Sequence, residues 1–390
     1  MTDKLNLDTY CSNAFGGFDS WAGAICCKII PQNKNVSFDT IINSEVSKQI
    51  QHDLLNGIKN PLCDDCWTQE RRGVKSLRYH STFAQLRGPE ADNYSHASII
   101  KEEVTNKKIR HLTIDSGNMC NLACRTCHPS LSSGLWKESE YKNNSKKFPK
   151  IYHESSVIKT NLALLMQEDY SAIEHVRILG GEPFLNLDHL CVLEKIIQDG
   201  NAGNCVLSYT SNGTTKLPSK IKSILSNFRH TSIMLSIDAI NDQFHYIRTT
   251  GNWQDVLDNI EDLLLETKNN IYISINSAIS VLNLFYIEEV YKLHASLGGD
   301  MELQFVTEPN HYSTNILRDY EKNVIIKYLE QSKFDCNSII QYVRESDYDP
   351  IARQRFYDEI AFTKEFRGLD INDYLPRLMS TLGGNYCYES

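Results

Sequence analysis

From residue 109 onward, short runs rich in β-branched residues alternate with longer segments of helical periodicity. Strands and helices that alternate in this way form βα units, which assemble into a parallel sheet covered by helices. The predicted strands are Ile109–Asp115, His175–Leu179, Cys205–Thr210, Ser232–Ile237, Ile271–Ala278 and Met301–Val306. The predicted helices include Leu187–Gln198, Trp253–Thr267 and Tyr286–Ser296. Six strands of this kind predict an α/β fold with an incomplete barrel.

Small, polar or metal-binding residues follow four consecutive predicted strands. A cysteine triplet follows the first strand, Gly180-Gly181-Glu182-Pro183 the second, and Ser211-Asn212-Gly213-Thr214 the third, and the fourth strand ends in Ser236-Ile237-Asp238. In α/β barrels the chemistry lies at the C-terminal ends of the strands. A sequence that served packing alone would not need such residues there, so we expect these four strand ends to form one site.

The 390 residues divide into three expected parts. These are a small cysteine-rich module over residues 1–100, a barrel over 101–310 and a helical extension over 311–390, consistent with the usual size of domains. Residues 137–150 are rich in Lys, Asn and Ser and are expected to form an exposed loop.

Composition and cysteine content narrow the class of protein. The net charge of −9 does not favour binding to the nucleic-acid backbone, and no window approaches eighteen consecutive apolar residues, so we expect no membrane span. Met1–Tyr10 lacks the apolar core of a secretory signal, which predicts a cytoplasmic protein. Because the cytosol keeps thiols reduced, the 12 cysteines indicate metal or cluster ligation more than disulfides.

The triplet consists of Cys120, Cys124 and Cys127, three thiols within eight residues. It is too compact for a disulfide scaffold and one ligand short of a closed tetrahedral zinc site. Three thiolates can hold three irons of a cubane cluster and leave the fourth iron open to a cofactor or substrate. A chance triplet or a zinc site is the alternative reading.

The spacing C-x3-C-x2-C, with a strand before it and a Gly-Gly pair at the next strand end, resembles the radical S-adenosylmethionine (SAM) family. The resemblance implies a partial (β/α)6 barrel, a [4Fe–4S] cluster on Cys120, Cys124 and Cys127, and SAM bound to the open iron. In that family an electron from the cluster cleaves SAM to methionine and a 5′-deoxyadenosyl radical, which abstracts hydrogen from the substrate. An external electron donor such as ferredoxin or flavodoxin is also implied.

The resemblance further assigns SAM-binding roles to the strand ends. Gly180, Gly181, Glu182 and Pro183 are similar to the motif whose backbone meets the methionine amino group, and glycine allows a close backbone approach. Ser211 and Asn212, with Gly213, resemble the segment that reaches the ribose. Ser236, Asp238 and Arg248 resemble the group around the methionine carboxylate, with a surface Arg–Asp pair as the alternative.

A second set of cysteines precedes the barrel. Cys11 is followed by Gly23, Cys26-Cys27 and later Cys63-Asp-Asp-Cys66, so the segment supplies four ligands. By spacing alone these could bind structural zinc. The segment resembles the twitch or SPASM module of radical SAM enzymes, which implies a second, auxiliary [4Fe–4S] cluster on Cys11, Cys26, Cys63 and Cys66. Cys26 is preferred over Cys27 because adjacent strand residues face opposite sides.

The leading functional hypothesis from the resemblance is a radical SAM oxidoreductase or maturase that modifies a peptide or protein side chain. One alternative is a radical SAM enzyme that acts on a small metabolite, a nucleoside or a sugar. Another is a non-catalytic iron–sulfur or zinc scaffold, which would not need functional residues at four strand ends.

Overall fold

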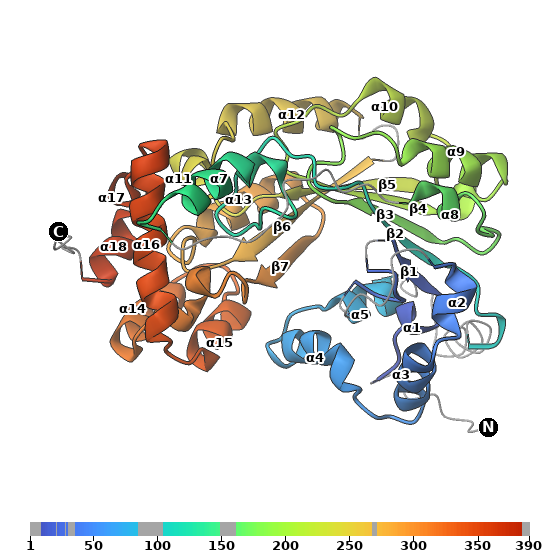
Figure 1. Cartoon of the computed structure of the whole chain (residues 1–390), viewed down its shortest axis with the longest axis horizontal. Helices are drawn as coiled ribbons and strands as arrows, with labels where there is room; N and C mark the ends of the chain where they lie inside the picture. Colours follow the sequence, from blue (N-terminus) through green and yellow to red (C-terminus); the bar gives the residue numbers. More distant parts are fainter. Residues whose placement is uncertain are drawn as a thin grey trace.

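The computed structural model describes residues 9–20, 22–27, 29, 36–84, 104–148, 161–266 and 271–383. A curved sheet lies at its centre, with helices along its outer face and at both of its edges (Figure 1). Within the described part of the chain, no helix is long and apolar enough to cross a membrane.

The sheet contains seven parallel strands in chain order, which makes it a half-barrel of the predicted α/β type. The strands are Gly17–Asp19 (β1), His111–Asp115 (β2), His175–Leu179 (β3), Val206–Ser211 (β4), His230–Ser236 (β5), Ile271–Ile279 (β6) and Met301–Phe305 (β7). The six predicted strands are therefore confirmed, with end shifts of one or two residues. The seventh, β1, comes from the N-terminal segment, and its three residues are too few to give a periodic signal.

The two faces of the sheet differ in polarity. One register row across neighbouring strands is fully buried and apolar: Leu112, Val176 and Leu207. The adjacent row is half-buried and polar: Thr113, Arg177 and Ser208. Successive side chains of a strand point to opposite faces, so the apolar rows pack under the outer helices and the polar rows face the inside of the half-barrel.

Helices follow the strands as the periodicity predicts. They are Leu162–Leu165 (α8), Leu190–Gln198 (α9), Ser219–Leu225 (α10), Asn241–Ile247 (α11), Trp253–Glu266 (α12) and Ile287–Leu297 (α13). Figure 1 shows α9, α10 and α12 along one face of the sheet. The three helices predicted in this part of the chain are confirmed, with ends shifted by at most three residues.

The predicted exposed loop at 137–150 is wrong over residues 137–144, because Trp136–Asn144 forms helix α7, and residues 149–150 lie outside the described residues. Its inner face carries charges that are buried in ion pairs. Glu138 lies 2.6 Å from Arg125, and Lys142 lies 2.5 Å from Glu359. A helix that buries paired charges lacks the apolar stripe by which helices are predicted, so the segment looks like a solvated loop in the sequence.

The C-terminal extension is helical, as expected. It contains Asp319–Leu329 (α14), Asn337–Glu345 (α15), Pro350–Arg367 (α16), Ile371–Tyr374 (α17) and Pro376–Thr381 (α18), beside β7 (Figure 1). Helix α16 begins with an Asp349 cap that accepts from Ile351 N and Ala352 N, and it ends at Gly368 in the left-handed conformation.

The N-terminal segment contains Asn13–Gly16 (α1), Phe38–Ile42 (α2), Glu45–Leu55 (α3), Asp64–Arg71 (α4) and Leu77–Tyr79 (α5). It touches both edges of the sheet. Strand β1 pairs with β2, whereas Arg72 lies 2.7 Å from Glu345 of α15 and His80 lies 3.6 Å from Glu302 of β7. The expected domain boundary near residue 100 falls outside the described residues, so the three-part division stays a prediction.

Candidate functional site

The cysteine triplet lies on the loop that follows β2, and the end of β3 holds this loop in place. The Gly181 amide donates to Gly117 O and the Glu182 amide donates to Met119 O, each at 2.7 Å. The Asn186 side chain donates to Ser116 O at 2.5 Å. The hydrogen bonding between β2 and β3 thus continues past the strands into the loop, which fixes the start of the cysteine motif.

The two glycines at the end of β3 are required by this packing. Gly180 has φ +135°, and a Cβ on it would lie 2.6 Å from Gly117 O. A Cβ on Gly181 would overlap Met119 O. The sequence predicts that the glycines let the backbone approach a cofactor. The structure adds a second reason, which is that a side chain at either position would displace the cysteine loop.

The three thiols are half-buried and lie close enough to influence one another, and two of them, Cys120 and Cys124, have N–H donors nearby. Burial raises the pKa of Cys124 to about 12 and that of Cys127 to about 11, and the other thiolates of the triplet add to both effects. Burial also raises the pKa of Cys120. As free thiols all three are protonated at neutral pH, and a bound metal would deprotonate them.

Side chains from the ends of other strands surround these sulfurs. Asn212, directly after β4, has its Nδ2 3.8 Å from Cys120 Sγ and donates to Asn121 Oδ1 at 2.9 Å. Arg248, directly after α11, has a terminal guanidinium nitrogen 3.9 Å from Cys124 Sγ. Such donors stabilise negative charge on sulfur, which is the form in which cysteine binds iron.

Glu182 is fully buried and connects the ends of β3 and β4. Its carboxylate accepts from Asn212 N at 2.8 Å, from Ser211 Oγ at 3.1 Å and from Phe184 N at 3.1 Å. Burial raises the pKa of Glu182 to about 7, although these hydrogen bonds oppose the shift. The Ser211 hydroxyl therefore bonds Glu182, and Glu182 fixes the backbone of Asn212, whose side-chain amide lies near Cys120.

The expected Asp238–Arg248 pair is present, and it is buried. Arg248 Nε lies 3.0 Å from Asp238 Oδ2, and Asp238 Oδ1 accepts from Ala278 N at 2.8 Å. Asp238 is only 1% exposed, so the alternative of a surface ion pair is excluded. Ser236 is half-buried on β5, in register with Asn276 of β6.

Sequence reasoning missed three residues that shape this site: Asn121, Arg125 and Asn186. Asn121 and Arg125 lie between the cysteines of the triplet. This position is the only feature of the sequence that could have identified them as site residues. Arg125 bonds Glu138 of α7 and Thr363 of α16, partners that only the folded structure brings near it.

Three of the four expected N-terminal ligands lie close together. Burial raises the pKa of Cys11 to about 11 and that of Cys63 to about 12, and Cys66 adds to both shifts. Cys11 Sγ also lies 3.9 Å from Ser81 Oγ. In the turn after β1, Cys26 is half-buried and Cys27 is exposed.

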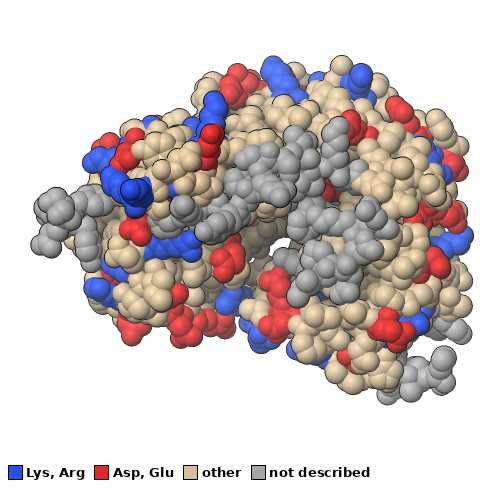
Figure 2. Space-filling model, in the orientation of Figure 1, with Lys and Arg blue, Asp and Glu red and all other residues tan. Residues whose placement is uncertain are grey.

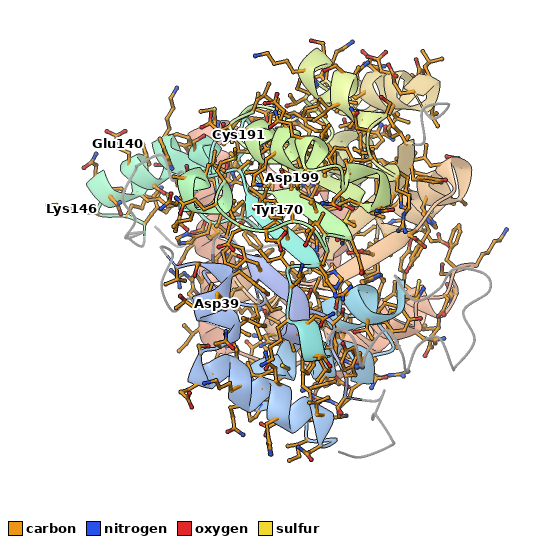
Figure 3. All side chains as sticks on the ribbon, turned by 90° about the vertical axis from the view of Figure 1, so that its right-hand side faces the viewer. Asp39, Glu140, Lys146, Tyr170, Cys191 and Asp199 are labelled. Atoms are coloured by element: carbon orange, nitrogen blue, oxygen red, sulfur yellow. The ribbon has the colours of Figure 1, made fainter. Side chains whose placement is uncertain are left out.

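Within the described ranges, no group of three or more His, Cys, Asp or Glu side chains is arranged to hold a single metal ion. Two of the described cysteines outside the two sets, Cys191 and Cys205, lie elsewhere in the fold. Cys191 is on α9, where Figure 3 labels it, and Cys205 is buried just before β4.

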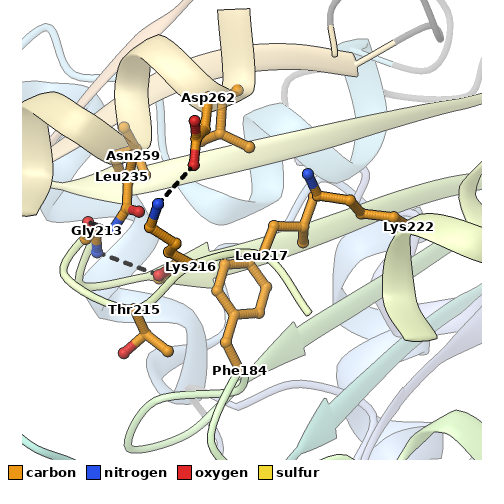
Figure 4. A pocket seen from close by; sticks show the side chains of 11 residues that line it. Phe184, Gly213, Thr215, Lys216, Leu217, Lys222, Leu235, Asn259 and Asp262 are labelled. Atoms are coloured by element: carbon orange, nitrogen blue, oxygen red, sulfur yellow. Dashed lines mark hydrogen bonds and ion pairs between the residues drawn. The ribbon is translucent and has the colours of Figure 1, made fainter. Parts of the chain in front are cut away.

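A small pocket of 50 Å³ lies beyond the end of β4 (Figure 4). Phe184, Gly213 and Leu217 line it, and Lys216 at its rim pairs with Asp262 at 3.1 Å. Ligand pockets begin at about 300 Å³. This pocket can hold only a few water molecules and is not the place for a cofactor.

Comparison with known proteins gives three kinds of result. No curated protein sequence matches the chain. The solved structure of anSMEcpe with bound AdoMet is 15% identical, with 67% of each chain covered and a TM-score of 0.37. The structure of anSMEcpe with AdoMet and the Kp18Cys peptide is 17% identical, again with 67% of each chain covered and a TM-score of 0.37.

Streptococcus suis SuiB bound to S-adenosylmethionine is 12% identical, over 80% of this chain and 64% of that chain, with a TM-score of 0.35. Residues 114–279 match the family model of the radical SAM superfamily. The matched range runs from β2 to β6 and includes the cysteine triplet together with the side chains that surround it. Residues 114–279 are therefore a radical SAM superfamily domain.

Proposed function

We propose that the chain is a radical SAM enzyme that holds a [4Fe–4S] cluster on Cys120, Cys124 and Cys127. The observation that carries this proposal is that one loop, fixed between β2 and β3, presents three half-buried thiols, with N–H donors from Asn212 beside Cys120 and from Arg248 beside Cys124. When bound, the cluster and SAM supply a 5′-deoxyadenosyl radical that abstracts hydrogen from a substrate. Three cysteine ligands fit a cubane whose fourth iron binds a cofactor.

The chain's own residues position the reactants and exclude water. Glu182 fixes Asn212 against Cys120, and Asp238 holds the Arg248 guanidinium beside Cys124. We assign SAM binding to the segment Gly180–Pro183, to Ser211 and Asn212, and to Ser236, Asp238 and Arg248. The common position of these residues at the strand ends around the thiols supports the assignment, because the cofactor must reach the cluster from that edge of the sheet.

The N-terminal set is proposed to hold an auxiliary [4Fe–4S] cluster on Cys11, Cys26, Cys63 and Cys66. The mutual influence of Cys11, Cys63 and Cys66 supports this proposal, because it requires thiols from two distant segments to lie together. The half-buried position of Cys26 favours it over the exposed Cys27. Ferredoxin or flavodoxin is the expected electron donor.

The proposed substrate is a peptide or protein side chain. The polar, half-buried row on the inner face of the half-barrel supports a substrate with polar groups, since Thr113, Arg177 and Ser208 there are not covered by the apolar core. If the inside of the half-barrel were only a hydrophobic core, apolar side chains would be buried at these positions.

The test uses single Cys→Ala substitutions at residues 120, 124 and 127, with Cys191→Ala as the matched control on α9. Each triplet variant should lose 5′-deoxyadenosine formation because two thiolates cannot hold the site-differentiated cluster, whereas the control should keep it. Product is measured by chromatography after anaerobic reconstitution and chemical reduction. Wild-type rates in any triplet variant would refute the assignment.

A further inference from the structure

A second pocket, of 280 Å³, adjoins the cysteine loop. It lies between this loop, α7, the segment after β7 and α16, and its lining includes both Cys124 and Cys127. Its volume is close to the lower limit of about 300 Å³ for ligand sites. A group in this pocket would therefore lie beside two of the thiols that are proposed to hold the cluster.

Besides Nε of Arg125, two buried polar atoms in the lining have no hydrogen-bond partner among the described residues. These are Nδ1 of His311, which is 8% exposed, and Oγ of Ser139, which is fully buried. Polar atoms that are buried in a native protein are nearly always hydrogen-bonded. Both side chains line the same pocket, so a polar ligand there would supply the missing partners.

One cation of the pocket lining, Arg355, is available to pair with an anion. Arg125 and Lys142 are neutralised by Glu138 and Glu359 at 2.6 and 2.5 Å. Arg355 is exposed on α16 and forms no ion pair or hydrogen bond with the described residues.

The pKa of His311 reflects the charged groups that lie near its ring. It is lowered to about 3 by burial and then by Arg355 and Lys142, so the ring is neutral at pH 7 and both charged groups that act on it are cations. The remaining acid of the lining, Glu308, is exposed and accepts from Asn310 N at 3.1 Å.

We propose that this pocket binds a carboxylate of the substrate, paired by Arg355 and hydrogen-bonded by His311 and Ser139. A guanidinium and two neutral hydrogen-bonding groups suit the two oxygens of a carboxylate. This inference rests on the proposed function, because the occupant is a substrate only if the neighbouring thiols hold the cluster. It narrows the substrate to one with an acidic group, such as an Asp or Glu side chain of a peptide.

The test compares two blocked amino acids that differ only in charge, N-acetyl-glutamate amide and N-acetyl-glutamine amide. Their affinities for the reconstituted full-length protein are measured by calorimetry, with and without SAM. The glutamate probe should bind on the order of tenfold more tightly, since charged hydrogen bonds are the stronger ones. Arg355→Gln should abolish this preference, and Ser139→Ala should weaken the binding of the glutamate probe several-fold.

Lys327→Gln is the matched control, because it removes an exposed cation of α14 outside the pocket and should leave the preference unchanged. Equal binding of the two probes, or an unchanged preference in Arg355→Gln, would overturn the proposal. So would competitive displacement of the probe by SAM, which would assign the pocket to the cofactor. Formation of 5′-deoxyadenosine is assayed in parallel, so that a failure of the proposed function is seen separately from the carboxylate preference.

Discussion

Gly181 is the residue whose substitution tests the cysteine loop most directly. A Cβ at this position would overlap the backbone oxygen of Met119, one residue before Cys120. We expect Gly181→Ala to shift the loop and to lower the iron bound after reconstitution, with a loss of stability of about 1–3 kcal/mol. Iron content by elemental analysis and the denaturation midpoint measure the two effects.

Gly203→Ala is the control, since a Cβ there meets nothing within 4 Å. It should leave both iron content and stability near the wild-type values. If Gly181→Ala bound iron normally but lost affinity for SAM, the glycine would be required for the approach of the cofactor and not for the packing of the cysteine loop.

At the scale of elements, α7 owes its position to buried ion pairs. Glu138 bonds Arg125 at 2.6 Å and Arg367 at 2.8 Å, and it is 3% exposed. We expect Glu138→Gln to destabilise the protein by about 3–5 kcal/mol, because it leaves the buried Arg125 charge without its carboxylate. Thermal or urea unfolding measures the change.

The stability of the double variant Arg125→Met/Glu138→Leu should be compared with that of Glu138→Gln. It removes both buried charges of the pair and should recover part of the lost stability. Glu140 lies two residues after Glu138 on the same helix and is exposed, so Glu140→Gln is the control with no expected effect beyond about 0.5 kcal/mol. A double variant as unstable as Glu138→Gln would show that the pair is not the cause.

The elements with an apolar pattern could be predicted from the sequence, whereas helix α7 and strand β1 could not. Strands β2 to β7 alternate or run apolar, and sequence reasoning located them within two residues. Helix α7 was missed because its buried face is charged, and β1 because it is only three residues long. The predicted strand ends do meet around Cys120 and Cys124, since parallel strands bring their C-terminal ends to one edge. The hydrogen bonds that Glu182 makes there depend on the folded geometry.

At the scale of the whole molecule, the sequence carries 49 acidic and 40 basic residues. On the face shown in Figure 2, the basic and acidic side chains of the described residues are interspersed. The described residues of that face therefore form no extended basic surface that would suit the nucleic-acid backbone.

The two cysteine sets lie on different segments, one before β2 and one after it, so they should be separable by mutation. The double variant Cys63→Ala/Cys66→Ala should keep the first cluster and 5′-deoxyadenosine formation, but it should lose turnover of the true substrate. Iron should fall from about eight to about four per chain, as expected for loss of one cubane. Stoichiometric zinc with about four irons in the wild-type protein would instead identify a zinc site, and the variant should then misfold.

The N-terminal segment also constrains the order in which the protein can be completed during synthesis. Arg72 pairs with Glu345, 273 residues later in the chain, and His80 pairs with Glu302. Contacts between residues so distant in sequence form late, after the intervening chain has folded. The segment that carries Cys63 and Cys66 leaves the ribosome early, yet its ion pair with α15 can form only after α15 has been made. Docking of that segment against α15 is therefore expected to accompany the last stage of folding.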